Sequence, residues 1–255
     1  MLELIVRGDE AAQIAERLLE HVDELPEEAF ADRNARITAP LPRPSKNIFA
    51  VGLNYARHNQ EFTGSDELPK NPIIFTKAPT SVIGPEDAIE LRPDLSPEID
   101  YEGELGVVIG KTGRDIPAEQ AQDYIFGYTI VNDVTARDLQ KRTSQWFLGK
   151  SLDTFCPMGP YLVHKSAVDW PLKLDIRTTV NGEVRQDSNT ELLYFDIPTL
   201  IATISAGITL EPGDIIATGT PEGVGMGFSP PKFLNAGDVV EIEIEKLGVL
   251  RNPVR

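Results

Sequence analysis

Residues 100–110 read DYEGELGVVIG, a stretch that joins two carboxylates to a run of branched apolar residues. The composition of Leu105–Ile109 is typical of a β-strand. Glu102 and Glu104 are two residues apart, and side chains at that spacing in a strand point to the same face, a few ångströms from each other. Asp100 would share this face. We therefore expect a strand that presents a row of carboxylates on one side.

A second strand-like run, Ile125–Val131, ends two residues before Asp133 and could add a third carboxylate to Glu102 and Glu104. Carboxylates that lie close together raise one another's pKa unless a cation separates them. Oxygen ligands without a nearby Cys or His suit Mg²⁺, Mn²⁺ or Ca²⁺ better than zinc. Spacing alone also fits a solvated acidic stripe on an exposed strand, and the residues leave both interpretations open.

Strand-like runs dominate the chain on both sides of this stretch. They are rich in Val, Ile and Tyr and comprise Ile48–Val51, Ile73–Thr76, Leu174–Val180, Ile215–Thr218 and Val239–Ile244. The expected helices are short, namely Tyr55–Glu61, Pro117–Asp123, Ala136–Lys141 and Ile197–Ser205. Between LDIRTTV and EVRQ, Asn181 and Gly182 indicate a tight hairpin, because both turn residues need a positive φ. These patterns predict a β-rich α+β domain.

The start of the chain is expected to form a small separate unit. Leu2–Val6 could be a strand, and Glu10–Val22 has apolar residues spaced four apart, as in an amphipathic helix. The run APLPRPSKN that follows holds three prolines and cannot be the interior of a helix, so it is expected to be an extended connector. We therefore divide the chain into an N-terminal unit, 1–45, and a main domain, 46–255.

Composition excludes several classes of protein. The chain has 255 residues, of which 41% are apolar, so a sizeable core is possible. It carries 40 acidic and 24 basic residues and a formal charge of −16. A surface this acidic repels nucleic acid and anionic membranes. It does not exclude a small anionic substrate, provided that a metal ion or a cationic pocket reverses the field locally.

The single cysteine, Cys156, permits no intrachain disulfide and is expected to be a packed small hydrophobe. The start MLELIVRGDEAA does not have the pattern of a signal peptide. No apolar run approaches the ~20 residues needed to cross a bilayer. We therefore expect a cytoplasmic protein.

The stretch GLNYARHNQEF contains His58 and Glu61, three residues apart. On a helix this spacing puts both side chains on one side, where the carboxylate can orient the imidazole. Such a pair could activate a water molecule as a general base. Taken alone, the pattern favours an exposed helical His–Glu pair on the surface.

Two further stretches attract attention because of their glycines. LGKSLDTFCPMGP contains Gly149-Lys150-Ser151, but a phosphate-binding loop would need glycine where Ser144 stands, so that interpretation is rejected. Lys150 is then either a surface lysine or a semi-buried one with an acidic partner. DIIATGTPEGVGMG has four glycines after a strand. It is either a mobile loop or a turn whose N–H groups approach a ligand.

Taken in order, the motifs resemble the fumarylacetoacetate hydrolase family, especially its short bacterial members and the acylpyruvase-like branch. The matching stretches are VGLNYARHNQE, PIIFTKAPTSVIGP, DYEGELGVVIGK, GYTIVNDVTARDLQ, FLGKSLDTFCPMGP, VNGEVRQ and IATGTPEGVG. They run from about Asn47 to Val224. The resemblance implies the mixed β-sandwich or β-roll of this family, usually as a homodimer.

The resemblance also implies roles for particular residues. It assigns a metal site for Mg²⁺ or Mn²⁺, with Ca²⁺ less expected, to Glu102, Glu104 and Asp133. It assigns activation of water to His58 and Glu61, on a segment that can close over the site, and an active-site lysine to Lys150. It assigns contacts with a small anionic 2-oxo acid to Arg137, Gln140, Thr220 and Lys77.

The reactions of the family share an enolate of a 2-oxo acid, which a metal ion stabilises. The resemblance favours hydrolysis of an acylpyruvate, with water activated by His58 and Glu61. Oxaloacetate decarboxylation and isomerisation of a hydroxyheptadienedioate are alternatives at the same site, because fold-level kinship does not determine the reaction. A structural Ca²⁺ site in a non-catalytic protein is a remote alternative, since such a site would need neither the His–Glu pair nor Lys150.

Overall fold

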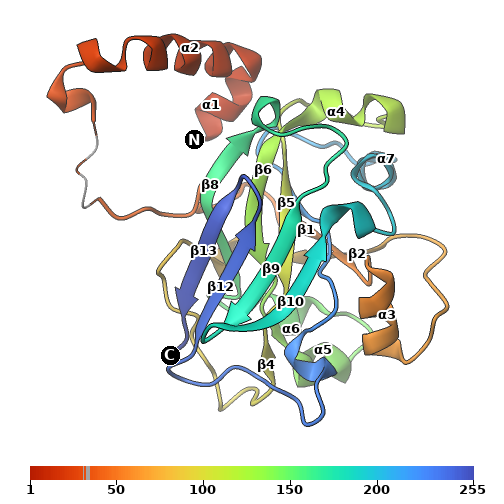
Figure 1. Ribbon diagram of the computed structural model, residues 1–255. Coiled ribbons are helices and arrows are strands. Elements are labelled where there is room, and N and C mark those ends of the chain that lie inside the picture. The colour runs from red at the N-terminus through yellow and green to blue at the C-terminus, as the bar shows by residue number, and fades with distance from the viewer. Residues whose placement is uncertain (31, 33–34) are drawn as a thin grey trace.

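The computed structural model describes residues 1–30, 32 and 35–255, and it is organised around a mixed sheet of seven strands (Figure 1). The strand order is β2-β1-β11-β5-β6-β8-β3. Most neighbours are antiparallel, and the pairs β1–β11 and β3–β8 are parallel. The strands of this sheet are β1 Ile48–Gly52, β2 Ile73–Lys77, β3 Val82–Ile83, β5 Gly103–Ile109, β6 Ile125–Asn132, β8 Cys156–His164 and β11 Ile215–Ala217.

A second, antiparallel sheet of four strands packs against one face of the first. Its order is β10-β9-β12-β13, and its strands are β9 Asp175–Val180, β10 Glu183–Asn189, β12 Val239–Ile244 and β13 Gly248–Pro253. The short strands β4 Ile99–Asp100 and β7 Thr135–Ala136 form a third pair. The β-rich α+β class predicted from the sequence is confirmed.

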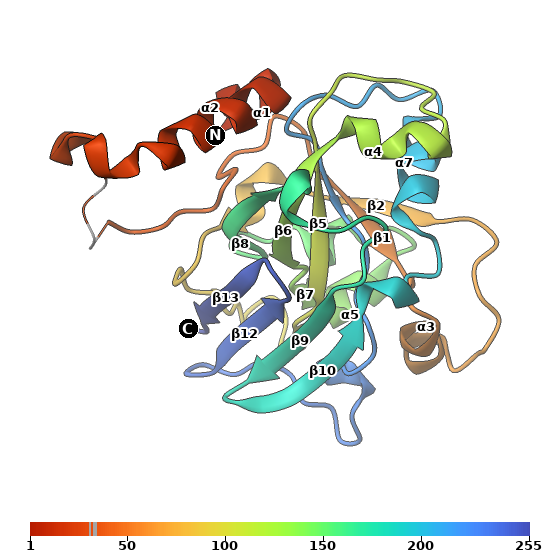
Figure 2. The ribbon, with the colours of Figure 1, turned by 45° about the horizontal axis from the view of Figure 1, so that its top comes forward.

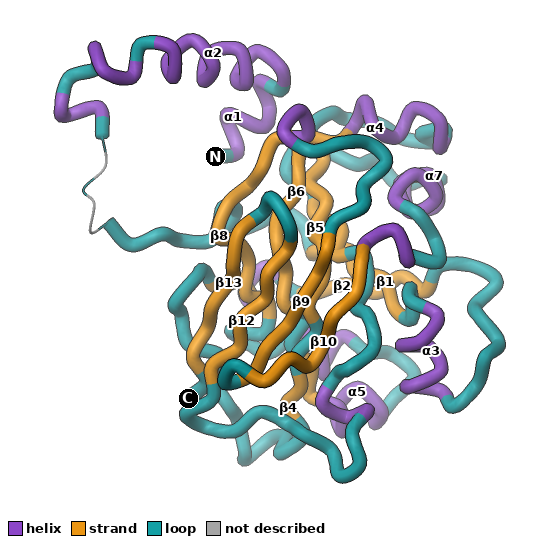
Figure 3. The backbone as a smooth tube through the Cα atoms, in the orientation of Figure 1, coloured by secondary structure: helices purple, strands orange, loops and turns teal. Residues whose placement is uncertain are grey.

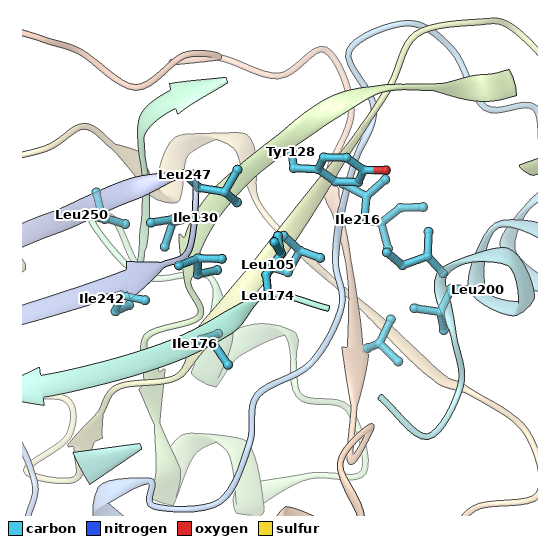
Figure 4. Close-up of a cluster of buried hydrophobic side chains, with 14 of the residues drawn as sticks. Leu105, Tyr128, Ile130, Leu174, Ile176, Leu200, Ile216, Ile242, Leu247 and Leu250 are labelled. Carbon is cyan, nitrogen blue, oxygen red and sulfur yellow. The ribbon is translucent and has the colours of Figure 1, made fainter. Parts of the chain in front are cut away.

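The main core lies between the two larger sheets, as the close-up in Figure 4 shows. Leu105 and Ile130 of the first sheet meet Ile176 and Ile242 of the second, and all four are at most 1% exposed. A smaller apolar cluster lies on the other face of the first sheet, where the proline-rich connector contributes Ala39 and Leu41. Both faces of the central strands are therefore covered, and β5 and β6 are buried along their whole length.

The hairpin predicted at Asn181-Gly182 joins β9 to β10. Asn181 has φ 53° and Gly182 has φ 77°, the left-handed conformations that this turn requires. The hairpin brings β10 back along β9, although the pairing shifts register between Val184 and Gln186.

Helices are short and lie around the sheets, as the tube view of Figure 3 shows. They are α1 Leu2–Arg7, α2 Asp9–Glu20, α3 Ala56–Thr63, α4 Ala121–Tyr124, α5 Arg137–Arg142, α6 Phe147–Lys150 and α7 Ile197–Ser205. Single 3-10 turns occupy Val22–Glu24, Glu27–Ala29, Pro79–Ser81, Ala118–Gln120, Lys165–Ala167, Thr190–Leu192 and Gly225–Gly227. The four helices expected in the main domain are present, and α7 has the predicted bounds. No helix among the described residues is long and apolar enough to span a membrane.

The N-terminal prediction was wrong in one element. The segment expected to be a strand at Leu2–Val6 is helix α1, because its apolar run is too short for periodicity to distinguish strand from helix. Only Ile5 of α1 is buried. The helix predicted at Glu10–Val22 is confirmed as α2, but Leu18 and Leu19 of its apolar face are 49% and 69% exposed. Figures 1 and 2 show both helices lying beside the β8 end of the sheet.

Candidate active site

Pairing of β5 with β6 brings the three predicted carboxylates together. Gly103 is paired with Asn132, which places Glu102 and Glu104 of one strand beside Asp133 at the end of the other. All three side chains are buried, and each offers a ligand atom within 4.8 Å of the other two. The alternative of a solvated acidic stripe is therefore excluded, since these carboxylates face the interior.

Asp100 does not join this cluster, contrary to the sequence-based expectation. The strand is interrupted after Asp100, which lies in the separate pair β4–β7. Its carboxylate binds Arg137 Nε at 2.8 Å and accepts the N–H groups of Gly225 and Met226. The interruption breaks the period of two, so Asp100 supports Arg137 rather than the three carboxylates.

Two buried lysines contact the carboxylates. Lys150 Nζ lies 2.7 Å from both Glu102 Oε2 and Asp133 Oδ2, so the lysine has the acidic partners that its semi-buried alternative required. Lys77 is fully buried and donates to Asp133 Oδ1 and to the carbonyl of Val134. Lys77 is not among the residues that line the cavity described below. Its contacts in this structure hold the Asp133 carboxylate in place.

Glu104 differs electrostatically from its neighbours. Within the part of the chain that the structure describes, its carboxylate accepts the N–H of Gly219 at 2.9 Å and contacts no cation. Burial, reinforced by the negative charges of Asp133 and Glu102, raises its pKa well above the ordinary value. Burial alone would raise the pKa of Glu102 too, but Lys150 and Arg137 outweigh it and the pKa is lowered. A further cation beside Glu104 would relieve the repulsion.

The charges of the cluster and the donor set fit a divalent ion. The buried ionic groups around the site are four carboxylates and three cations, namely Asp100, Glu102, Glu104, Asp133, Lys77, Lys150 and Arg137. With Glu104 ionised, one negative charge among these described groups remains without compensation, and burying such a charge is costly. A divalent ion would reverse the net charge to positive, which suits an anionic substrate. The oxygen-only donors are those that Mg²⁺ and Mn²⁺ prefer.

Arg137 occupies one end of the site with part of its guanidinium unsatisfied. Its Nη1 lies 2.7 Å from Glu102 Oε1 and 3.2 Å from Gln140 Oε1. Its Nη2 is buried and has no hydrogen-bond partner among the described residues. An unpaired buried donor is costly, so this atom is suited to an acceptor that a ligand brings.

The cavity between these groups is small, with a volume of about 10 Å³, roughly the space of one water molecule. One side of it is polar, and the other is lined by the aromatic rings of Phe62, Phe75 and Trp146. His58, Glu102, Glu104, Arg137, Gln140, Lys150 and Thr220 also line it. A substrate of several carbon atoms can enter only after part of this wall has moved.

The predicted His58–Glu61 pair lies on α3 at the edge of the cavity. His58 Nδ1 is 3.1 Å from Glu61 Oε2, and both side chains are largely buried, so the pair is not an exposed surface pair. The other carboxylate oxygen, Glu61 Oε1, accepts the N–H of Gly223 at 3.0 Å. Because an ionised Glu61 favours a proton on Nδ1, the Nε2 atom is left as the basic nitrogen. His58 lines the cavity and Glu61 orients it from behind.

The glycine-rich loop was expected to direct N–H groups either to a ligand or into solvent. Instead, the N–H groups of Gly219, Gly223 and Gly225 donate to the protein's own carboxylates, Glu104, Glu61 and Asp100 respectively. The loop therefore fixes acidic side chains from three different elements. It also carries Thr220, which is 2% exposed and lines the cavity, so its predicted contact with substrate stays a prediction.

Sequence reasoning missed other residues of the site. The rings of Phe75 and Trp146 pack edge to face at 5.3 Å between centroids. Asn54 holds the base of α3 by donating to the carbonyls of Phe195 and Thr218. Trp146 and Asn54 lie within or beside matching motifs but have no charge pattern that would single them out.

The fumarylacetoacetate (FAA) hydrolase C-terminal family matches residues 47–255. The chain belongs to the fumarylacetoacetate hydrolase family. An oxaloacetate tautomerase of Bacillus subtilis is 50% identical over 258 residues, which span all of this chain and 86% of that protein. A mitochondrial oxaloacetate tautomerase of Rattus norvegicus is 48% identical over all of this chain and 79% of that protein.

Solved structures of this family share the fold. A fumarylacetoacetate hydrolase from Exiguobacterium antarcticum has a TM-score of 0.83 and 45% identity, and the match covers 100% of this chain and 87% of that one. A 5-carboxymethyl-2-hydroxymuconate delta-isomerase from Mycobacterium smegmatis has a TM-score of 0.75 and 45% identity over 86% of this chain and 79% of that one. Of these four relatives, two are named as tautomerases and one as an isomerase, and one is named as a hydrolase.

Proposed function

We propose that this protein is a divalent-metal-dependent tautomerase of oxaloacetate or a closely related 2-oxo acid. The observation that carries the proposal is that His58, paired with Glu61, lines the same small cavity as Glu102 and Glu104 of the three-carboxylate cluster. An acid–base group and a site for stabilising an enolate are the two requirements for moving a proton between carbon and oxygen. Relatives named oxaloacetate tautomerase support this choice among the family's reactions.

The metal ion in this proposal is Mg²⁺ or Mn²⁺, held by Glu102, Glu104 and Asp133. When bound, it supplies positive charge that lowers the energy of the substrate's enolate. Lys150 adds to this charge. Burial alone would lower the pKa of Lys150, but Asp133 and Glu102 outweigh it and the pKa is raised, so the side chain remains an ammonium group rather than a base.

His58 is the proposed proton carrier. In the direction from enol to keto, one proton leaves the enol oxygen and one proton is added to carbon 3. Neutral His58 can accept a proton at Nε2 and, as imidazolium stabilised by Glu61, return it, so no proton is gained or lost overall. At the other end of the site, Arg137 Nη2 and Gln140 are suited to bind a carboxylate of the substrate.

Hydrolysis of an acylpyruvate and decarboxylation of oxaloacetate use the same groups and remain outcomes of the test. The purified protein, with Mg²⁺ or Mn²⁺, is given oxaloacetate enriched in its enol form, and the decay of enol absorbance is followed. Pyruvate release from oxaloacetate and cleavage of acylpyruvates are measured alongside. We expect accelerated enol decay that exceeds both other activities and disappears after exhaustive chelation. Faster acylpyruvate cleavage, or full activity after chelation, would contradict the proposal.

We also propose that the protein acts in the cytoplasm as a twofold homodimer that binds neither nucleic acid nor membranes. The acidic charge of −16 supports the absence of a polyanionic partner. The open edges of both sheets support an assembly that covers them. The division of the chain at residue 45 stays a prediction.

A further inference from the structure

Gln186 is a buried polar residue that no part of the proposed reaction uses. It lies on β10 in the second sheet and is fully buried. Val184, two residues earlier, is 51% exposed, although residues two apart in a regular strand share a face. The register shift between them makes Arg185 the extra residue of a β-bulge. A bulge redirects side chains, and this one turns the amide inward toward the active site.

The carboxamide of Gln186 connects the second sheet to two parts of the site. Its Oε1 accepts the N–H of Gly103 at 2.9 Å, between the carboxylates of Glu102 and Glu104. Its Nε2 donates to Thr220 Oγ1 at 2.7 Å and to the carbonyl of Pro221 at 2.9 Å. Both N–H bonds and the carbonyl oxygen are thus used, which satisfies the buried amide.

The orientation of this amide is determined by two backbone groups. Reversing it would place Nε2 against the N–H of Gly103 and Oε1 against the carbonyl of Pro221, so two donors and two acceptors would oppose each other. Neither backbone group can change its polarity. The amide nitrogen must therefore face Thr220, and no alternative assignment of the amide atoms is compatible with the contacts.

The amide in turn orients the hydroxyl group of Thr220. Because Thr220 Oγ1 accepts from Gln186, its proton goes to the carbonyl of Gly103 at 3.0 Å. Both bonds tie the side chain to the wall of the cavity. We propose that Gln186 is a positioning residue of the active site, which acts on the bound substrate by holding Thr220 in place in the cavity wall that the substrate contacts. This inference rests on the proposed function in taking Thr220 as a substrate contact.

The test is a double-mutant cycle between the two residues. The single variants are Gln186→Met, which keeps the length and removes the amide, and Thr220→Val, and they are compared with the double variant. Gln186→Asn, which is too short to reach both partners, is a second probe in case the methionine variant does not fold. Thr178→Val is the matched control, because Thr178 pairs with Gln186 across the strands and its buried hydroxyl has no partner among the described residues.

Calorimetry measures two affinities in each variant. The first is the affinity of the metal-free protein for Mn²⁺. The second is the affinity of the Mn²⁺-loaded protein for oxalate, a planar mimic of a 2-oxo acid enolate. We expect Gln186→Met and Gln186→Asn to weaken oxalate binding about 10-fold, as the loss of a buried hydrogen-bonding network implies. Mn²⁺ affinity should change less than about 3-fold, because the amide contacts no carboxylate of the cluster. When Gln186→Met is added to the Thr220→Val variant, the affinity for oxalate should fall by less than about a further 2-fold.

Independent effects of the two substitutions on oxalate binding would overturn the inference, and so would a Thr178→Val variant as impaired as Gln186→Met. Absence of oxalate binding by the wild-type protein would overturn it as well, since Thr220 would then lack its assigned role. Enol decay measured on the wild type is a separate readout. If that activity is absent while the coupling in oxalate binding is present, the proposed tautomerase function fails and the positioning role of Gln186 stands.

Discussion

Glu61 and Gly227 are packed so closely that a β-carbon at position 227 would lie 1.9 Å from Glu61 Oε1. Glu61 belongs to α3, and Gly227 belongs to the loop after β11, far away in the sequence. The same carboxylate oxygen accepts the N–H of Gly223 in that loop. The position of the His58–Glu61 pair therefore depends on the absence of a single side chain.

The first prediction concerns this contact. Gly227→Ala should displace Glu61 and reduce turnover about 10- to 100-fold, because His58 loses the group that orients it. Gly227 does not have a positive φ, so the effect is steric rather than conformational. Gly207→Ala is the control. Its added carbon meets nothing within 4 Å, but its φ of 81° makes alanine unfavourable, so stability should fall by ~1 kcal/mol with turnover unchanged. Equal turnover in both variants would contradict the prediction.

The second prediction separates proton transfer from metal binding. His58→Ala should lower the rate of enol decay about 10²- to 10⁴-fold, the usual contribution of a general acid–base group. Mn²⁺ affinity should be unchanged, because His58 is not one of the three carboxylates. Any acylpyruvate cleavage should fall in parallel, whereas decarboxylation of oxaloacetate, which needs no attacking water, should persist. His21→Ala is the control, since the His21 side chain is 62% exposed. A loss of bound metal in the His58 variant would show that the pair has been misassigned.

The third prediction concerns stability without metal. Burial and neighbouring carboxylates raise the pKa of Glu104, so the ionised form destabilises the metal-free fold. Glu104→Gln should therefore stabilise the metal-free protein at pH 7, by roughly 1–3 kcal/mol. It should also abolish the rise in melting temperature that Mn²⁺ produces in the wild type. Thermal unfolding with and without Mn²⁺ measures both effects, and a variant that is less stable without metal would refute the argument.

The sign of the pH dependence follows from the same shift. An acid whose pKa is higher in the folded state stays protonated up to a higher pH in that state than in the unfolded chain. Its contribution to stability is thus lost as pH rises from the ordinary glutamate value, ~4.5, through the raised pKa. The difference in unfolding free energy between Glu104→Gln and the metal-free wild type should accordingly be small below pH 4.5 and grow above it.

The fourth prediction concerns the single thiol. Burial raises the pKa of Cys156 to about 12, and the side chain is completely inaccessible. The thiolate is the reactive form, so the native protein should resist alkylation by iodoacetamide at pH 8. Denatured protein should take up one equivalent, which mass spectrometry detects. Rapid labelling of the native protein would be inconsistent with the packed position of this residue.

The fifth prediction concerns assembly. Sedimentation velocity at micromolar concentration should give a dimer, because an isologous interface of ~1,000 Å² or more would cover sheet edges. The exposed apolar side chains Leu4, Val6, Leu18 and Leu19 also indicate a surface that another chain could cover. A monomer under these conditions would rule the proposed homodimer out.

Strands with an uninterrupted run of branched residues, such as β6, were predicted, whereas β8, which contains two prolines and a glycine, and β13 were missed. Helix α1 was not, because its apolar run is too short to show a period. Asp100 was placed on the wrong face because the interruption before Gly103 leaves no trace in the spacing of the carboxylates.

Sequence by itself determined the residue types of the site. The order of the motifs identified the family and singled out Glu102, Glu104, Asp133, His58, Glu61 and Lys150, which lie close together in the structure and whose roles stay predictions. These side chains are charged or titratable, and they lie in sequence motifs that can be recognised without any structure.

Tertiary structure alone decided which neutral and glycine residues complete the site. Gln186 reaches Thr220 only because a bulge turns it inward, and Gly227 matters only because Glu61 fills the space beside it. Such contacts join segments from 34 to more than 100 positions apart, and their meaning depends on shape and hydrogen-bond direction rather than on composition. No local pattern of residues records that information.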